Sequence, residues 1–459
     1  SGKARNMGLN GRDEHHSPSS AKSPRGGGGG EHNSPPISCP RGGAVSSFLL
    51  AAALLTFSLS IGITATLAVT FSTSLSLCPM QALFFPATSA RFVQPESDVR
   101  PPGADVPRLA YLISGSIGDL DRLWRVLHAL YHPRNLYVVH LDLKSPVEDR
   151  LELATRVGNN TVFQRIGNVE VIRRANMVTY RGPTMVAHTL HACAVLLRRS
   201  RDWDWFINLS ASDYPLMTQD DILHVFSTLP RNVSFMEHTS NLGQKAEGRA
   251  KPLIVDPGLY MSAKKEVFNV WPARQLPTAF KLYTGSAWVV LSRDFVEYVV
   301  WGWDNLPRTL LMYYANFVSS PEGYFQTVLC NAPSFVRTVA NHDLHHIQWD
   351  VPARQHPRAL GLPDRDGMVG SGTPFARKFE RDDPVLDVID ADLLLGRGRN
   401  GTAAGMFVPG GWCGQHRDCG AARANVDDWV LSPGPGAERL RRLMDRIVRS
   451  QAFDGSQCK

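Results

Sequence analysis

The chain has 459 residues, of which 43% are hydrophobic, 20% charged and 9% aromatic, a composition that excludes a wholly disordered or coiled-coil protein. The formal net charge of +7 fits anionic substrates or a membrane surface, whereas no dense basic block favours nucleic acid. The seven cysteines are too few to build a fold from disulfides alone.

The first hundred residues predict a membrane anchor. Residues 1–43 are low in complexity, with five consecutive glycines, and are expected to be a disordered tail. Residues 44–75 carry no charge and exceed the roughly 20 residues that span a bilayer, although many Ser and Thr weaken their hydropathy. A cleaved signal peptide is the alternative, but so long a tail and apolar run fit one poorly.

The basic residues of the tail set the expected orientation, because positive charge stays on the cytoplasmic side. We therefore expect a single-pass type II membrane protein with a cytoplasmic tail. Residues 76–107, which are rich in proline towards their end, are expected to form a stem. Residues 108–459 would then be a lumenal catalytic domain, with a C-terminal extension from about residue 380.

A lumenal domain can carry disulfides and N-linked glycans. Sequons at Asn159, Asn232 and Asn400 are candidate glycosylation sites. Asn208 also matches the sequon, but it lies in an apolar run and is expected to be buried and unmodified. Five cysteines are disulfide candidates, which leaves one unpaired and the pairing open: Cys193, Cys330, Cys413, Cys419 and Cys458.

The lumenal part begins with a β-α-β pattern. Residues 108–114 form a short apolar run, residues 118–131 carry apolar side chains at helical spacing, and residues 135–142 form a second apolar run. Ser116 and Asp119 fit a capping box before the helix. A right-handed crossover between parallel strands follows, and with it an α/β fold.

Further strands and helices continue the alternation. Strands are predicted at residues 169–172, 205–209, 233–237, 287–291 and 335–339. Helices are predicted at residues 184–199, 219–226, 293–300 and 322–331, and an amphipathic helix at 436–450 is expected to pack on the domain.

Two predicted strands end in polar residues. His140 and Asp142 end the second strand, and Ser212 and Asp213 follow the strand at 205–209. Ligands of open α/β sheets bind beyond the carboxyl ends of strands. A carboxylate there can accept hydrogen bonds from ribose hydroxyls or a base edge, although capping a loop is the commoner role of such a residue.

Several motifs are absent or misplaced. The chain has no Walker loop, Gly-x-Gly-x-x-Gly, Gly-x-Ser-x-Gly or His-Glu-x-x-His pattern. Asp202 and Asp204 form an Asp-x-Asp pair, but this pair precedes its strand and so lies at the wrong end for a metal site. His342, His345 and His346 lack an obvious further zinc ligand and are expected in a loop or strand edge.

Five segments together resemble the branching β-glycosyltransferase family, known as glycosyltransferase family 14. The family includes core-2 N-acetylglucosaminyltransferases, peptide O-xylosyltransferases and plant β-glucuronosyltransferases. Each segment alone is a weak pattern, but five in family order are a strong one: residues 135–142, 205–216, 283–288, 320–327 and 375–379. Residues 174–187, with 355–357, resemble the plant glucuronosyltransferase branch specifically.

The resemblance implies a GT-A-like, Rossmann-type sheet and inversion at the anomeric carbon of a UDP-sugar. Inversion needs one base that takes the proton of the acceptor hydroxyl. Glu322 matches the family's catalytic Glu in the pattern Glu-x-x-aromatic-x-Thr. Pro321 suits the first turn of a helix, which would present Glu322 at its start. An ordinary acid at a helix start is the alternative.

The resemblance also implies that basic side chains, in place of a metal, stabilise the departing diphosphate. Arg377 and Lys378 match the family's basic segment, with solvated surface as the alternative. A second upstream arginine is not identified, since Arg354 and Arg358 are both candidates. The plant relatives tend to have Arg where this chain has His345, which would alter specificity or activity if that position touches the donor.

The remaining matched positions divide between donor and acceptor. The resemblance places His140 and Asp142 near the uridine, and Asp213 near the donor sugar or the acceptor. Gly285, Ser286 and Trp288 match a segment that lines the acceptor side. An indole can stack there on a sugar face, although a core role for Trp288 is an equal alternative.

The sequence therefore predicts a Golgi type II β-glucuronosyltransferase. It would transfer glucuronic acid from UDP-glucuronic acid to the galactan chains of arabinogalactan proteins, with no metal or cofactor. A related UDP-N-acetylglucosamine or UDP-xylose transferase is the first alternative. A catalytically silent carbohydrate-binding protein is the second. A hydrolase is disfavoured, because no second catalytic carboxylate can be identified.

Overall fold

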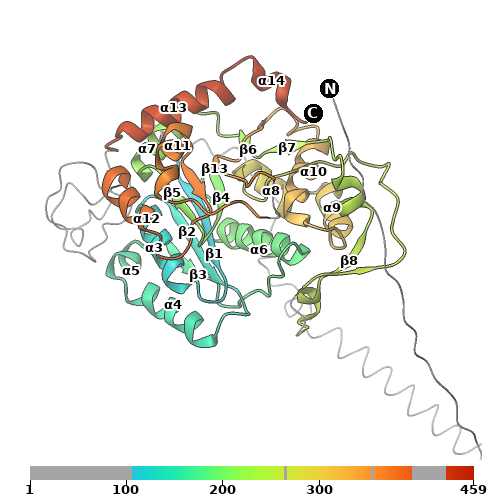
Figure 1. The fold of residues 1–459 in the computed structure, drawn as a ribbon, viewed down its shortest axis with the longest axis horizontal. Helices are drawn as coiled ribbons and strands as arrows, with labels where there is room; N and C mark the ends of the chain where they lie inside the picture. Colours follow the sequence, from blue (N-terminus) through green and yellow to red (C-terminus); the bar gives the residue numbers. More distant parts are fainter. Residues whose placement is uncertain (1–105, 263–265, 353–355, 395–430) are drawn as a thin grey trace, which may run out of the picture. The chain divides into compact units, whose positions relative to one another are not determined.

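A seven-stranded mixed sheet forms the centre of the computed structural model, which describes residues 106–262, 266–352, 356–394 and 431–459 (Figure 1). The strands follow the order β12-β6-β11-β4-β1-β2-β3. Their bounds are β1 Leu109–Gly115, β2 Leu136–Leu141, β3 Val169–Val171, β4 Trp205–Ser210, β6 Ser234–Phe235, β11 Val290–Ser292 and β12 Val339–Ala340.

The predicted α/β fold is confirmed, and the parallel sheet is confirmed for β4, β1, β2 and β3. β11, whose direction the sequence does not predict, runs antiparallel to β4 and to β6. β11 starts at the sheet edge where β6 ends, so the connection from β6 to β11 does not have to cross the sheet, as a connection between parallel strands would.

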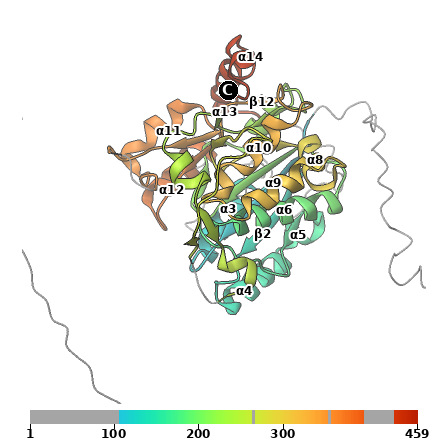
Figure 2. The same ribbon diagram turned by 90° about the vertical axis from the view of Figure 1, so that its right-hand side faces the viewer.

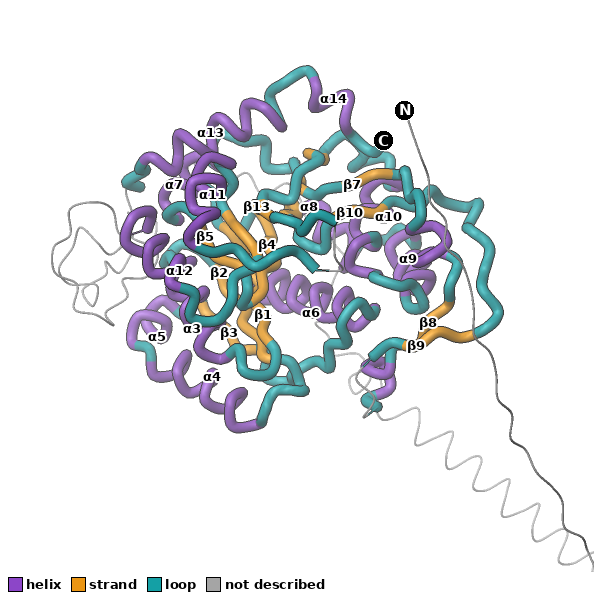
Figure 3. The backbone as a smooth tube through the Cα atoms, viewed as in Figure 1, coloured by secondary structure: helices purple, strands orange, loops and turns teal. Residues whose placement is uncertain are grey.

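Helices cover both faces of the sheet (Figure 3). Because side chains of a strand alternate, Leu109, Tyr111 and Ile113 face one core, whereas Ala110 and Leu112 face the other. The first core includes side chains of α3 Leu120–Leu130, α4 Val147–Asn159, α5 Thr161–Ile166, α7 Gln219–Phe226 and α13 Pro435–Ile447. The second includes those of α6 Pro183–Arg199, α8 Arg293–Trp301, α9 Leu306–Tyr314 and α10 Tyr324–Asn331.

Smaller elements surround this framework. A three-stranded sheet has the order β13-β14-β5, and two strand pairs are β10-β7 and β8-β9. The strands are β5 Asp213–Pro215, β7 His238–Thr239, β8 Leu253–Val255, β9 Phe268–Val270, β10 Thr284–Gly285, β13 His345–Ile347 and β14 Phe375–Arg377. The helices are α11 Arg365–Ser371, α12 Pro384–Ile389 and α14 Ala452–Ser456, and the short 3-10 or π turns are η1 Ala246–Ala250, η2 Pro257–Tyr260, η3 Ser320–Glu322, η4 Leu362–Asp364 and η5 Asp390–Leu394.

Two predicted helix starts differ in the structure. The Asp119 carboxylate accepts a hydrogen bond from the Ser116 amide at 2.9 Å, but the Ser116 hydroxyl donates to Asp142 instead of closing a capping box. The helix predicted from residue 322 begins at Tyr324, because Gly323 has a non-helical backbone with φ −151° and ψ −29°. Glu322 therefore ends the 3-10 turn η3.

The C-terminal helix packs on the domain as predicted. Leu440, Leu443 and Met444 of α13 are buried in the first core. The Asp221 carboxylate of α7 accepts a hydrogen bond of 2.6 Å from the Gly434 amide, which fixes the chain just before α13. Figure 2 shows α13 and α14 together beside the C-terminal end.

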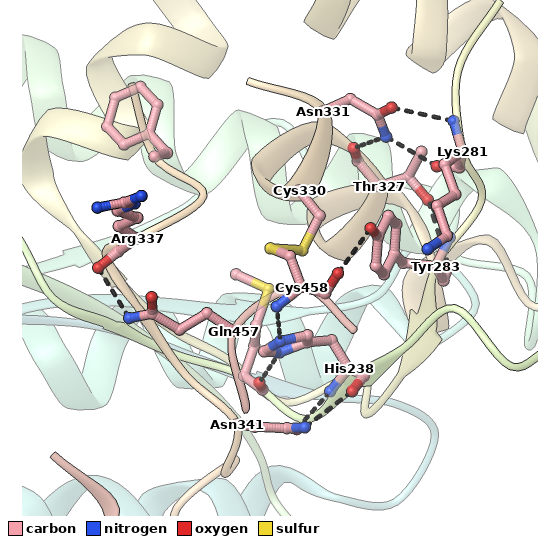
Figure 4. The surroundings of a disulfide bond; sticks show 12 residues. His238, Lys281, Tyr283, Thr327, Cys330, Asn331, Arg337, Asn341, Gln457 and Cys458 are labelled. Carbon is pink, nitrogen blue, oxygen red and sulfur yellow. Dashed lines mark hydrogen bonds between the residues drawn. A yellow bond between two sulfur atoms is a disulfide. The ribbon is translucent and has the colours of Figure 1, made fainter. Parts of the chain in front are cut away.

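A disulfide between Cys330 of α10 and Cys458 settles one pairing that the sequence leaves open (Figure 4). The Cys458 amide donates to Nε2 of His238 at 2.9 Å, and its carbonyl accepts from the Tyr283 hydroxyl at 2.8 Å. Cys193 is a buried free thiol. Cys413 and Cys419 lie outside the described residues.

None of the helices within residues 106–262, 266–352, 356–394 and 431–459 has the length and hydropathy needed to cross a bilayer. The predicted tail, the predicted membrane span and nearly all of the predicted stem precede the described residues.

Candidate active site

A cavity of about 190 Å³ opens at the carboxyl ends of β1, β2 and β4. Both residues expected near the uridine, His140 and Asp142, line it. This is the edge of the sheet where the sequence predicts a ligand. Polar or aromatic lining from other segments includes Ser114, Ser116, Asp119, His188, Asn208, Ser210, Trp288 and Phe325.

The Asp142 carboxylate is fixed at the rim of this cavity. It accepts hydrogen bonds from the Lys144 amide at 2.5 Å and from the Ser116 hydroxyl at 3.3 Å. Burial raises the pKa of Asp142, while these bonds and the Lys144 ammonium act in the opposite direction. Its oxygens can therefore accept hydrogen bonds from ligand hydroxyl or N–H groups without rearrangement.

The strand pair β14-β5 brings Arg377 directly opposite Asp213. The Arg377 Nη1 lies 3.5 Å from the Asp213 carboxylate, which also accepts from the amide and hydroxyl of Ser210. The guanidinium stacks on Trp288, 3.8 Å from the ring centroid. Burial lowers the pKa of Arg377, and the carboxylates of Asp213 and Asp343 oppose that shift. Asp213 and Trp288 thus hold Arg377 in one position.

Lys378 is less constrained by its surroundings than the adjacent Arg377. Its carbonyl accepts from the Leu360 amide at 2.8 Å, and its side chain is half-buried. Among the described residues the ammonium forms no ion pair. The basic pair predicted from sequence therefore consists of one cation held by an ion pair, Arg377, and one without an ion pair among the described residues, Lys378.

Glu322 lies next to Pro321, which lines the cavity. Its carboxylate is 31% exposed and forms an ion pair and hydrogen bond with the Arg249 guanidinium of η1. The Tyr180 phenol is close enough for both Glu322 and Arg249 to affect its pKa, which burial raises. Sequence reasoning missed Arg249, which is 73 residues from its partner and belongs to no motif.

The segment expected on the acceptor side is positioned by close packing. A Cβ atom on Gly285 would lie 1.7 Å from the Glu237 carbonyl oxygen, so only glycine fits. The Ser286 hydroxyl accepts from the Trp288 amide at 3.2 Å, and its carbonyl accepts from the Gln326 side chain at 2.6 Å. Trp288 is partly exposed and lines the cavity, so it is not a plain core residue.

The remaining histidines and arginines take different positions. The His345 ring lies between Trp288, at 5.9 Å between centroids, and Phe375, at 5.4 Å, and is therefore close to the cavity. Arg358 pairs with Asp364 at 2.6 Å, whereas Arg354 lies outside the described residues.

Neither sequence pattern considered for a metal forms a cluster in the described part of the chain. Asp204 accepts a hydrogen bond of 2.9 Å from the Arg108 amide, and Asp202 pairs with the Arg108 side chain at 3.1 Å, at the amino end of β4. Within the described residues, one group of three has metal-ligand spacing: His238, Cys330 and Cys458. Its two sulfurs are joined in the disulfide.

The sequons differ in their exposure, and the burial predicted for Asn208 is confirmed. Asn159 and Asn232 are exposed. Asn208 is buried, donates to the Ala287 carbonyl at 3.0 Å and accepts from the Val289 amide at 2.8 Å. Asn400 lies outside the described residues.

The chain is similar in sequence to a known family and to known proteins. Residues 109–366 match the family model of the Core-2/I-branching enzyme. The chain is 60% identical over 355 residues to beta-glucuronosyltransferase GlcAT14A of Arabidopsis thaliana, covering 77% of this chain and 78% of the relative. It is 48% identical over 354 residues to GlcAT14C of the same plant, covering 77% and 86%. It is 29% identical over 322 residues to human xylosyltransferase 2, covering 65% and 35%.

The α/β fold and these matches define a glycosyltransferase. More particularly, the chain belongs to the Core-2/I-branching enzyme family, and the resemblance drawn from the five sequence segments is confirmed.

Proposed function

We propose that this chain is an inverting β-glucuronosyltransferase that transfers glucuronic acid from UDP-glucuronic acid to β-galactan side chains of arabinogalactan proteins. The identity to relatives named beta-glucuronosyltransferases, which spans more than three quarters of this chain, supports the donor. The carboxylate of Glu322 beside the cavity is the observation that carries the mechanism. The central sheet with its cavity also fits a GT-A-like, Rossmann-type fold.

Glu322 is proposed as the base. Its carboxylate takes the proton of an acceptor hydroxyl while that oxygen bonds to the anomeric carbon and the bond to UDP breaks. Attack from the face opposite UDP inverts the anomeric centre. Arg249 holds the carboxylate in place through their ion pair, so the base does not need to be ordered during each turnover.

Lys378 and Arg377 are proposed to stabilise the charge that develops on the departing diphosphate. Arg377 is anchored by Asp213 and Trp288 and offers a fixed charge. Lys378 has a mobile ammonium that can follow the phosphate oxygens. Two cations at this position support a reaction without a metal or other cofactor.

The remaining site residues complete the proposal. His140 and Asp142 would contact the uridine, and Asp213 would lie near the donor sugar or acceptor. Gly285, Ser286 and Trp288 would form the acceptor side, where the partly exposed indole can stack on a sugar ring.

We also propose a single-pass type II Golgi membrane protein with its catalytic domain in the lumen. The exposed asparagines Asn159 and Asn232 suit a compartment in which sequons are glycosylated. The Cys330–Cys458 disulfide suits an oxidising compartment.

The test measures UDP release by the purified chain with UDP-glucuronic acid and a β-galactan acceptor in the presence of EDTA. We expect acceptor-dependent release, and we expect Glu322→Gln to lower kcat by about 10²–10⁴ fold. Glu247→Gln is the matched control, because Glu247 is an exposed carboxylate of η1 that pairs with Lys251 away from the cavity.

Other results would overturn defined parts of the proposal. Activity with UDP-N-acetylglucosamine or UDP-xylose alone would reject the donor and keep the family. Loss of activity in EDTA, restored by a divalent metal, would reject the metal-free reaction. Glycan binding without UDP release from any donor would favour a binding protein.

A further inference from the structure

Two residues with left-handed backbones join the turn before α6 to the turn that carries Glu322. Arg181 has φ 62° and Ser319 has φ 58°, a region that residues other than glycine rarely adopt. The Ser319 amide donates to the Arg181 carbonyl at 2.9 Å, and Nε of Arg181 donates to the Ser319 hydroxyl at 3.0 Å. Strained backbone of this kind is concentrated at functional sites, where the surrounding structure has to hold it. The pair therefore directs attention to the Arg181 guanidinium.

The turn that carries Arg181 borders the candidate active site. Val178 and Met185, which lie on either side of Arg181 in the chain, line the cavity. Arg181 itself is half-buried. Its two hydrogen bonds with Ser319 tie it to the segment that continues into the η3 turn and Glu322. A guanidinium is thus fixed at the border of the site that contains the proposed base.

Three arginines lie close enough to the exposed Tyr180 phenol to oppose the burial that raises its pKa: Arg181, Arg249 and Arg377. Arg249 pairs with Glu322, and Arg377 pairs with Asp213. In the described part of the chain, Arg181 alone of the three forms no ion pair and donates only through Nε. Its Nη1 and Nη2 groups therefore remain available to an anion.

A glucuronosyl donor brings such an anion to the site. Glucuronic acid carries a carboxylate where glucose carries a hydroxymethyl group and xylose only a hydrogen atom. A carboxylate that leaves water without a cationic partner is strongly disfavoured. The parallel N–H groups of a guanidinium match the two oxygens of a carboxylate. A site for glucuronic acid therefore needs an arginine that no protein carboxylate already occupies.

We propose that Arg181 binds the carboxylate of the donor's glucuronosyl group through Nη1 and Nη2, and that it thereby selects UDP-glucuronic acid over UDP-glucose. Ser319 is the positioning residue, because its hydroxyl holds Nε and so sets the direction of the other two nitrogens. This inference rests on the proposed function, which makes the donor UDP-glucuronic acid. UDP-glucose offers no charge to the guanidinium, so the difference between the two affinities is the selectivity.

The first test compares the dissociation constants of UDP-glucuronic acid and UDP-glucose, measured by titration calorimetry on the purified full chain without an acceptor. Arg181→Met keeps an unbranched side chain but removes the charge and the donors. The affinity for UDP-glucuronic acid is expected to fall about tenfold to hundredfold, while that for UDP-glucose changes by less than about threefold. Arg173→Met is the matched control, because Arg173 is an exposed arginine of the same connection and does not line the cavity.

The second test addresses the positioning role. Ser319→Ala keeps the backbone N–H that binds the Arg181 carbonyl but removes the acceptor of Nε. We expect the KM for UDP-glucuronic acid to rise about threefold to tenfold with a smaller change in kcat, and the preference over UDP-glucose to shrink. Arg181→Lys keeps the charge without the fork of N–H groups and should retain part of the preference. A merely structural link between the two turns would weaken both donors equally.

The outcomes separate this inference from the proposed function. If the wild-type chain neither binds nor turns over UDP-glucuronic acid, the proposed function itself fails. If it uses this donor and Arg181→Met keeps the wild-type ratio of the two affinities, whether both are retained or both fall together, the carboxylate assignment is wrong and the proposed function stands. If Ser319→Ala keeps both the ratio and the KM, the positioning role is wrong.

Discussion

Gly285 shows how tightly a single residue constrains the proposed acceptor side of the site. β10 and β7 approach so closely there that the Glu237 carbonyl occupies the space where any side chain would begin. The next residues, Ser286 to Trp288, hold the indole at the cavity. A side chain at residue 285 therefore has to move the strand that positions Trp288.

We predict that Gly285→Ala destabilises the fold and lowers activity. Overpacking against backbone should cost about 3 kcal/mol or more, because the carbonyl cannot rotate away as a side chain could. The midpoint of thermal unfolding and the UDP release rate measure both effects. Gly248→Ala is the control, since no neighbour lies within 4 Å of a Cβ atom at that position. Equal melting temperatures for the two variants would contradict the prediction.

At the scale of elements, the pairing of β14 with β5 gives adjacent cations different surroundings. Register puts Arg377 opposite Asp213, where the two charges and the Trp288 ring compensate for burial. Lys378, one residue further, has no such partner in the described part of the chain. Arg377 thus belongs to the framework as well as to the proposed site, whereas Lys378 belongs to the proposed site and forms no ion pair in the described part of the chain.

Substitution by methionine should separate these roles. Lys378→Met is expected to keep the wild-type free energy of unfolding within about 0.5 kcal/mol, since no ion pair is lost, and to raise the KM for UDP-glucuronic acid at least about tenfold. Arg377→Met is expected to lose about 3 kcal/mol of stability as well, because Asp213 stays buried without its partner. Chemical denaturation and donor kinetics on both variants measure this. The same stability for both variants would refute the framework role.

The sequence predicts helix and strand bounds correctly where nearby residues determine them. The helix at 219–226 coincides with α7 Gln219–Phe226, whose start is fixed by a capping box between Thr218 and Asp221. The direction of β11 was not predictable, because strand direction depends on where the intervening chain returns. The predicted start of α10 is two residues early because Gly323 has a non-helical backbone, with φ −151° and ψ −29°, which the residue pattern does not reveal.

The residues of the candidate site can likewise be separated into those that the sequence predicts and those that it does not. The five segments predicted Glu322, Lys378 and the residues at the strand ends. Four of these segments contribute to the cavity at the carboxyl ends of β1, β2 and β4, and the fifth reaches it through Arg377, which stacks on Trp288. Arg249 and His188 carry no comparable signal, because each meets its partner through the fold and not through sequence spacing.

At the scale of the whole molecule, the C-terminal residues are tied to the rest of the α/β domain at two places. Asp221 binds the chain before α13, and the disulfide joins Cys458 to α10, the helix that follows Glu322. The second tie also presents Cys458 to His238 of β7, the strand that pairs with β10. The disulfide therefore supports both the C-terminal end of α10, through Cys330, and β7, through the hydrogen bond between Cys458 and His238.

The double variant Cys330→Ser/Cys458→Ser tests this dependence. The bond closes a loop with a sequence separation of 128 residues, so its loss should lower the free energy of unfolding by about 3–5 kcal/mol. Cys193→Ser is a comparison for the loss of a thiol without loss of a bond. Thermal and denaturant unfolding under non-reducing conditions measure the difference. Wild-type stability in the double variant would show that the hydrogen bonds alone hold the C-terminal residues.

The alternation along β14 also limits how this segment can change in length during evolution. Side chains on a strand switch faces at every residue, so the gain of one residue before Arg377 would bring Ala376 opposite Asp213, and the loss of one would bring Lys378 there. A change of two residues would restore the face but bring Phe375 or Phe379 opposite Asp213. Insertions and deletions that keep the Arg377–Asp213 pair should therefore be confined to the loops outside β14, such as the one beyond Phe379.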